Sequence, residues 1–138
     1  EINQYPRLLH KHFFQLAVCL ESAGETDRAL KSYKLSENAG SKQPQLYIRR
    51  ALLNERLGDG VAAAHDFNHA VELNAEYPPA QLSQALFLAR TGRGEEAEKI
   101  ATTVQAKKHF YAEIIRDVLK DRENFAKAWP QAAARVAK

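Results

Sequence analysis

The sequence is poor in sulfur and contains no long apolar run. Of its 138 residues, one is a cysteine, Cys19, and none is a methionine. A single thiol excludes an internal disulfide and a cysteine-based zinc cluster. Apolar runs stop at five residues, as in Leu16–Leu20, whereas roughly 18 are needed to span a bilayer. We therefore expect no membrane span. A chain that begins with Glu and lacks Met is expected to be a processed chain or, as we favour, a piece of a longer protein.

The composition is that of a folded domain. Apolar residues make up 45% of the chain and charged residues 27%, which argues against a disordered polypeptide. The lone cysteine lies inside an apolar run, and free cysteines are among the most often buried residues. The sequence therefore predicts that Cys19 is buried.

Positive charge gathers toward the C-terminal end. The net charge is +3, and the residues from Gln105 onward hold eight Lys or Arg against four acids. This end suggests an alternative function, the binding of nucleic acid or another anionic polymer. Its candidate residues are Lys107, Lys108, Arg116, Lys120 and Arg122. Nucleic acid is the less favoured partner. Its recognition would need aromatic residues interleaved with cations in a binding groove, so that they could stack on bases, and the groove described below lacks them.

A period of 34 residues organises most of the chain. Gly24, Gly58 and Gly92 are separated by 34 residues each, and Pro44 and Pro78 by the same step. Two series of alanines follow the same period, namely Ala17, Ala51 and Ala85, then Ala29, Ala63 and Ala97. A fixed period of this length indicates stacked helical hairpins.

Prolines and glycines set the expected limits of the helices. The expected helices are 6–23, 27–38, 44–57, 61–73, 79–91 and 95–104, then 107–120 and a further helix from Asn124 that Pro130 interrupts or restarts. The side chains expected to point inward are Ala29, Leu30, Tyr33 and Leu35, then Ala63, Phe67, Ala70 and Val71, and finally Phe110, Ile114 and Val118.

With these residues in place, the chain resembles the tetratricopeptide repeat family. The second unit carries the family pattern in Tyr47, Ala51, Gly58, Ala63, Phe67, Ala70 and Pro78, and the first unit departs from it at Ser36. The resemblance implies an all-α, right-handed solenoid of stacked helix-turn-helix units. It implies one domain over residues 1–138, with units at about 10–43, 44–77 and 78–106 and a degenerate capping unit at 107–138.

The resemblance also implies a binding groove lined by the first helix of each unit. The residues at groove positions are apolar, and three arginines lie at its rim. The apolar residues are Phe14, Val18, Ile48, Leu52, Leu82 and Leu86, and the rim residues are Arg49, Arg56 and Arg90. We therefore expect a non-catalytic scaffold that binds an apolar or amphipathic protein segment, with affinity of about micromolar order after the costs of association.

Two other interpretations of the apolar stripe stay open at this stage. The helices could be rolled so that the chain itself covers these residues, which the polar Arg50 and Asn54 at expected packing positions would favour. Alternatively, an exposed stripe could drive self-association. A further possibility is an accessory segment of an enzyme whose catalytic domain lies elsewhere.

A carboxylate clamp for a chaperone tail is not expected. In the chaperone-binding branch of the family the groove holds Lys, Asn and Arg, and the matching positions here are Phe14, Val18, Arg49, Pro79 and Ser83. Only Arg49 could contact a carboxylate.

Neither a metal site nor a catalytic site is predicted. His65 and His69 are four residues apart, a spacing that can bind a metal on a helix. The packing residues beside them place both on an outer face, with no obvious third ligand beyond Glu72. No nucleophile stands beside a base at a recognisable spacing, so no enzymatic activity and no cofactor are expected.

Overall fold

The computed structural model describes residues 6–105 and 109–128, and this part of the chain is helical without strands. This confirms the all-α fold class predicted from the sequence, and consecutive helices pack in pairs as stacked hairpins would. The helices are α1 (Pro6–Ser22), α2 (Thr26–Asn38), α3 (Pro44–Arg56), α4 (Gly60–Leu73), α5 (Pro78–Arg90), α6 (Gly94–Gln105) and α7 (His109–Ala128). Within the described residues, no helix is both long enough and apolar enough to cross a membrane.

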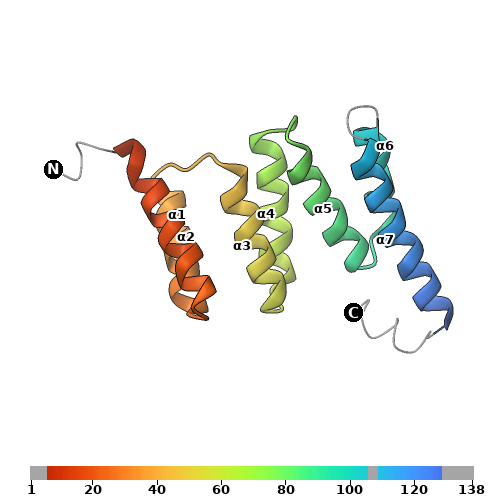
Figure 1. The fold of residues 1–138 in the computed structure, drawn as a ribbon, viewed down its shortest axis with the longest axis horizontal. Coiled ribbons are helices and arrows are strands. Elements are labelled where there is room, and N and C mark those ends of the chain that lie inside the picture. The colour runs from red at the N-terminus through yellow and green to blue at the C-terminus, as the bar shows by residue number, and fades with distance from the viewer. Residues whose placement is uncertain (1–5, 106–108, 129–138) are drawn as a thin grey trace. The chain divides into compact units, whose positions relative to one another are not determined.

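The chain divides into two compact units, which are described separately. Unit 1 comprises residues 1–73 and holds two helical hairpins, α1 with α2 and α3 with α4 (Figure 1). Unit 2 comprises residues 74–138, and in it α5, α6 and α7 pack against one another. The division falls four residues before the predicted boundary between the second and third repeats.

The periodic glycines end the first helix of each hairpin. Gly24, Gly58 and Gly92 have φ values of +79°, +83° and +83°, a backbone conformation that glycine adopts without the steric cost of a Cβ atom. At the second of these turns the Gly58 amide donates to the Glu55 carbonyl at 3.0 Å, and the next amide donates to the Asn54 carbonyl at 2.9 Å. The Asp59 side chain then accepts the Ala62 amide at 3.1 Å and caps the start of α4.

The periodic alanines are fully buried, as their spacing predicts. Ala17, Ala51 and Ala85 have no exposed surface, and the same holds for Ala29, Ala63 and Ala97. Small side chains at these positions let the two helices of a hairpin approach closely. In unit 2 the core consists largely of such residues, together with Leu88, Val104 and Ile115.

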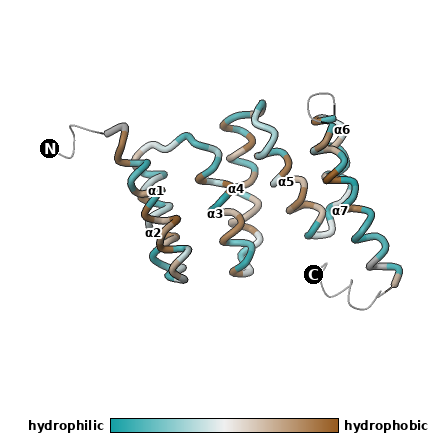
Figure 2. Tube along the Cα trace, in the orientation of Figure 1, coloured by the Kyte–Doolittle hydropathy of each residue, from teal (hydrophilic) through white to brown (hydrophobic). Residues whose placement is uncertain are grey.

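Two predictions about inward-facing residues in unit 1 are wrong. Cys19 is exposed rather than buried, and Leu35 is 44% exposed. The run Leu16–Leu20 passes round the whole helix, so only Ala17 and Leu20, three residues apart, lie in the core. Figure 2 shows hydrophilic and apolar residues alternating along these helices.

The buried face of α2 contains two serines. Ser32 and Ser36 are buried beside Ala29 and Tyr33. The Ser36 hydroxyl donates a hydrogen bond of 2.6 Å to the His10 carbonyl of α1. A hydroxyl is therefore satisfied at the position where the family pattern has alanine.

The C-terminal helix differs from its prediction in two ways. Helix α7 runs without a break through Asn124, where a second helix was expected to start, because residues 109–128 contain neither glycine nor proline to end it. Phe110 is 67% exposed rather than inward, and Ala112 and Ile115 occupy the core instead. Lys107, Lys108 and Pro130 lie outside the described residues.

Candidate functional site

The predicted groove residues of unit 1 form a partly exposed apolar surface on α1 and α3. Phe14, Val18 and Ile48 are half-buried, and Leu52 is 41% exposed. The Phe14 ring lies 6.1 Å from the ring of Tyr33, measured between centroids, so one edge of this surface belongs to the core. We call these four residues, Phe14, Val18, Ile48 and Leu52, the α1–α3 surface.

An ion pair between the two helices borders the α1–α3 surface. Glu21 follows Val18 by three residues on α1, and Arg56 follows Leu52 by four residues on α3. Their side chains meet at 2.8 Å, between Arg56 Nη2 and Glu21 Oε2. Residues three and four apart share a helix face, so the ion pair fixes the two apolar stripes on the same side of unit 1.

The Glu21 carboxylate also accepts a hydrogen bond from a buried tyrosine. The Tyr33 hydroxyl donates to Glu21 Oε1 at 2.6 Å. Burial and this hydrogen bond raise the pKa of Tyr33 to about 12, although the neighbouring Arg49 opposes the rise. Arg49 itself is exposed. Of the predicted rim residues, Arg56 is therefore paired with Glu21, and Arg49 lies near the Tyr33 hydroxyl.

The predicted groove residues of unit 2 lie on α5. Leu82 packs against the unit 2 core, while Leu86 and Arg90 are half-buried. Part of the Leu82 surface is thus used within the protein. Of the positions weighed for a carboxylate clamp, Pro79 and Ser83 are also half-buried on this helix.

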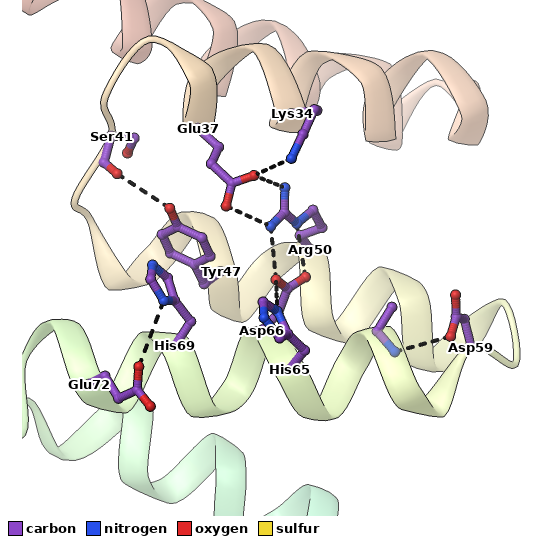
Figure 3. Close-up of polar contacts among 11 residues, drawn as sticks. Lys34, Glu37, Ser41, Tyr47, Arg50, Asp59, His65, Asp66, His69 and Glu72 are labelled. Carbon is purple, nitrogen blue, oxygen red and sulfur yellow. Dashed lines mark hydrogen bonds and ion pairs between the residues drawn. The ribbon is translucent and has the colours of Figure 1, made fainter.

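Sequence reasoning missed a buried charged cluster that connects three helices of unit 1. The Arg50 side chain is 12% exposed, and its guanidinium donates two hydrogen bonds of 2.8 Å to Asp66 on α4. It also donates two of 3.3 Å to Glu37 on α2 (Figure 3). We call these residues, Arg50, Asp66 and Glu37, the Arg50 cluster.

The Arg50 cluster explains why a charged residue stands at a packing position of α3. Arg50 keeps its packing position because the two carboxylates satisfy its charge, and Asn54 is buried on the same helix. Fixed hydrogen bonds raise the pKa of Arg50 despite its burial. The signal in the sequence was Asp66 itself, which shares the buried stripe of Ala63, Phe67 and Ala70.

An open pocket of about 540 Å³ lies beside the Arg50 cluster. Its charged groups already bind one another, since Lys34 contacts Glu37 at 3.0 Å and Asp59 caps α4. The charged groups that line the pocket are therefore mainly engaged in contacts within the protein.

The two histidines considered as metal ligands have different environments. His65 is exposed, whereas the His69 ring lies edge-on to Tyr47 with centroids 4.3 Å apart. His69 Nδ1 is 3.9 Å from Glu72 (Figure 3). Among residues 6–105 and 109–128, no group of three or more His, Cys, Asp or Glu side chains is placed to hold a metal ion.

No protein-family model, curated protein or solved structure matches this chain.

Acid is expected to destabilise unit 1 through Glu37. Burial raises the pKa of Glu37, but hydrogen bonds from Arg50 and Lys34 outweigh it and lower the pKa from 4.5 to about 2. Because the folded-state pKa is the lower one, this stabilisation is complete above about pH 4.5 and is lost as the pH falls toward 2. We expect Glu37→Gln to lower the free energy of unfolding at pH 7 by about 1–3 kcal/mol, and the difference from wild type to vanish near pH 2.

Urea unfolding between pH 2 and pH 7, followed by circular dichroism, measures this difference. The control is Glu25→Gln, which removes an exposed ion pair with Arg28 and should cost less than about 1 kcal/mol at pH 7. A Glu37→Gln protein whose deficit stays constant down to pH 2 would contradict the assignment.

Proposed function

We propose that this chain is a non-catalytic protein-binding scaffold of tetratricopeptide type, whose unit 1 binds an apolar or amphipathic segment on the α1–α3 surface. The observation that carries the proposal is Leu52, a large apolar side chain 41% exposed between Ile48 and the Arg56–Glu21 ion pair. Full burial of a leucine contributes about 1.5–3 kcal/mol. The neighbouring arginines supply polar contacts at the border.

An amphipathic helix fits this surface better than a charged polymer does. Apolar residues four apart on α1 and again on α3 form two short parallel rows, which can accept the apolar face of a helix. Arg49 flanks the α3 row and can pair with an acidic residue at the edge of such a ligand, whereas the charge of Arg56 is already partly used by Glu21. The ligand proposed is therefore a segment with an apolar face bordered by Asp or Glu.

The basic C-terminal residues support the alternative function less well. Arg116 binds Glu98 at 3.0 Å and Gln105 at 2.8 Å, so its charge is partly used inside unit 2. Lys120 is exposed and Arg122 is half-buried.

The test is peptide selection followed by affinity measurement. Peptides enriched from a displayed random library by the wild-type chain should bind with a Kd of about micromolar order. We expect Leu52→Asp to weaken binding at least tenfold, because it places a carboxylate in the apolar contact. Leu35→Asp is the matched control, since Leu35 is 44% exposed on a different helix, and it should bind as wild type does.

The dependence of binding on salt concentration distinguishes the two candidate functions. Binding through the α1–α3 surface should change little between 50 mM and 500 mM salt, whereas phosphate-type binding falls steeply. Equal affinity in wild type and in Leu52→Asp, with circular dichroism unchanged, would refute the proposal. Loss of binding to salt alone would assign the function to the basic end.

A further inference from the structure

A buried asparagine of α3 faces the pocket beside the Arg50 cluster. Asn54 is 9% exposed and is one of the residues that line this pocket. Its backbone carbonyl accepts the Asp59 amide at 2.9 Å, but within residues 6–105 and 109–128 its side-chain amide has no hydrogen-bond partner. Because the amide is not fully enclosed by protein atoms, a molecule in the pocket can reach it. Buried polar groups are nearly always hydrogen-bonded, so this amide has bonding capacity left for a ligand.

The pocket lies between the two hairpins of unit 1, at the polar positions of α3. Arg50 and Asn54 are four residues apart and share one face of this helix. Arg50 fills its position by binding Asp66 and Glu37, whereas the shorter Asn54 side chain has no such counterpart in the described part of the chain. The pocket volume of about 540 Å³ is within the range of roughly 300–1,000 Å³ that is usual for small-molecule sites.

The charged groups around the pocket favour a cationic ligand over an anionic one. Two cations line it, Lys34 and Arg50, against three carboxylates, Glu37, Asp59 and Asp66, so these five groups have a formal charge of −1. Arg50 already binds Asp66 and Glu37, and Lys34 binds Glu37. An anion would therefore meet cations that have partners and an excess of negative charge.

Asp59 has a carboxylate oxygen that is available to a ligand. It is exposed in the turn before α4, and its Oδ1 accepts the Ala62 amide at 3.1 Å (Figure 3). Its second oxygen, Oδ2, makes no hydrogen bond or ion pair with the residues that the structure describes. Val61, which is 85% exposed, and Ala62 also line the pocket. The pocket thus combines an amide, a carboxylate oxygen and aliphatic surface.

We propose that this pocket binds a short aliphatic amine, whose ammonium group donates hydrogen bonds to the Asn54 side-chain oxygen and to Asp59 Oδ2 while its alkyl stem lies against Val61. An ammonium group has three donors and no acceptor, which suits a site with unused acceptors and excess negative charge. The lysine side chain of a partner protein has the same chemistry as a free alkylamine. The pocket shares no residue with the α1–α3 surface, and it does not depend on the proposed function.

The probe is pentylamine, with pentanol and pentanoate as its neutral and anionic analogues of similar length. The full isotope-labelled chain is titrated with each compound at pH 7, and the side-chain amide signals of Asn54 are followed by NMR. We expect saturable shifts with pentylamine and a Kd of about millimolar order, because a ligand of few atoms makes few contacts. Pentanol and pentanoate should bind at least tenfold more weakly, since neither donates a charge-assisted hydrogen bond.

Two variants test the proposed contacts. Asp59→Asn can still cap α4 but lacks the carboxylate, and Asn54→Leu keeps a similar volume without the amide. Each should weaken pentylamine binding at least tenfold, as followed through the backbone amide of Val61. The matched control is Asp27→Asn, which removes an exposed carboxylate outside the pocket and should bind as wild type does.

A peptide probe separates the two sources of the amine. Acetyl-glycyl-lysyl-glycinamide carries the same alkylammonium group on a peptide backbone. Binding of this peptide at least as tight as that of pentylamine would assign the pocket to a lysine side chain of a partner. Weaker binding of the peptide would assign it to a free amine.

Three results would overturn the proposal. One is the absence of a saturable shift with pentylamine, which would mean that water satisfies the Asn54 amide. Another is equal affinity for pentylamine and pentanol, or tighter binding of pentanoate. The third is unchanged affinity in Asp59→Asn, whose exposed position keeps the variant folded and measurable.

Discussion

The Arg50→Met protein is expected to lose about 3–5 kcal/mol of the free energy of unfolding of unit 1, because breaking a buried ion pair leaves a charge without a partner. Asp66 is the group affected, since it is 3% exposed and receives two hydrogen bonds of 2.8 Å from Arg50. Methionine fills much of the arginine volume, so the loss reports the charge rather than a cavity.

Hydrogen exchange of the amides of α3 and α4 measures this loss directly, with unit 2 as an internal reference. The control is Arg28→Met, whose pair with Glu25 is exposed and should contribute less than about 1 kcal/mol. Adding Asp66→Leu to Arg50→Met should recover most of the stability, because it removes the unpaired carboxylate. An Arg50→Met protein as stable as Arg28→Met would show that the cluster does not stabilise unit 1.

Phe67→Ala is expected to have an effect of similar size, about 3–5 kcal/mol, for a different reason. Phe67 has no exposed surface and lies between Ala63 and Ala70 on the buried stripe of α4. The surrounding alanines are short and cannot reach into the space that the ring leaves. A cavity should therefore remain, and its cost adds to the lost apolar burial.

The matched control is Val61→Ala on the same helix. Val61 is 85% exposed, so its truncation should change stability by less than about 0.5 kcal/mol. Phe67→Leu should cost less than Phe67→Ala, and it keeps the prediction measurable where Phe67→Ala unfolds unit 1. Urea unfolding gives the three values, and equal values for Phe67→Ala and Phe67→Leu would contradict a cavity at this position.

The sequence predicted the fold class and the helix limits well because both depend on local rules. Gly58 ends α3 and Pro44 begins it, and each acts within one turn of its own position. The same reasoning was wrong for α7, where a slipped period suggested a break at Asn124 that no glycine or proline enforces. Cys19 was predicted to be buried from its apolar neighbours, but a helix with five apolar residues in succession must turn some of them outward.

The Arg50 cluster could not be predicted because its members belong to three different helices. Glu37 and Asp66 are 13 and 16 residues from Arg50, and no local pattern pairs residues at those separations. The partial exposure of Phe14 and Ile48 also depends on how neighbouring helices pack, which the 34-residue period does not specify. The sequence thus predicted which residues make up the α1–α3 surface, whereas the exposure of each of them follows only from the structure.

The charged contacts between the two hairpins of unit 1 affect how unit 1 unfolds. In a simple stack each hairpin can open on its own, so unfolding proceeds from the ends in steps. Here opening the first hairpin would leave Arg50 without Glu37 and Arg56 without Glu21, while opening the second would leave Glu37 without its arginine. The four helices should therefore unfold as one cooperative block, with the amides of α2 and α4 exchanging at a common rate.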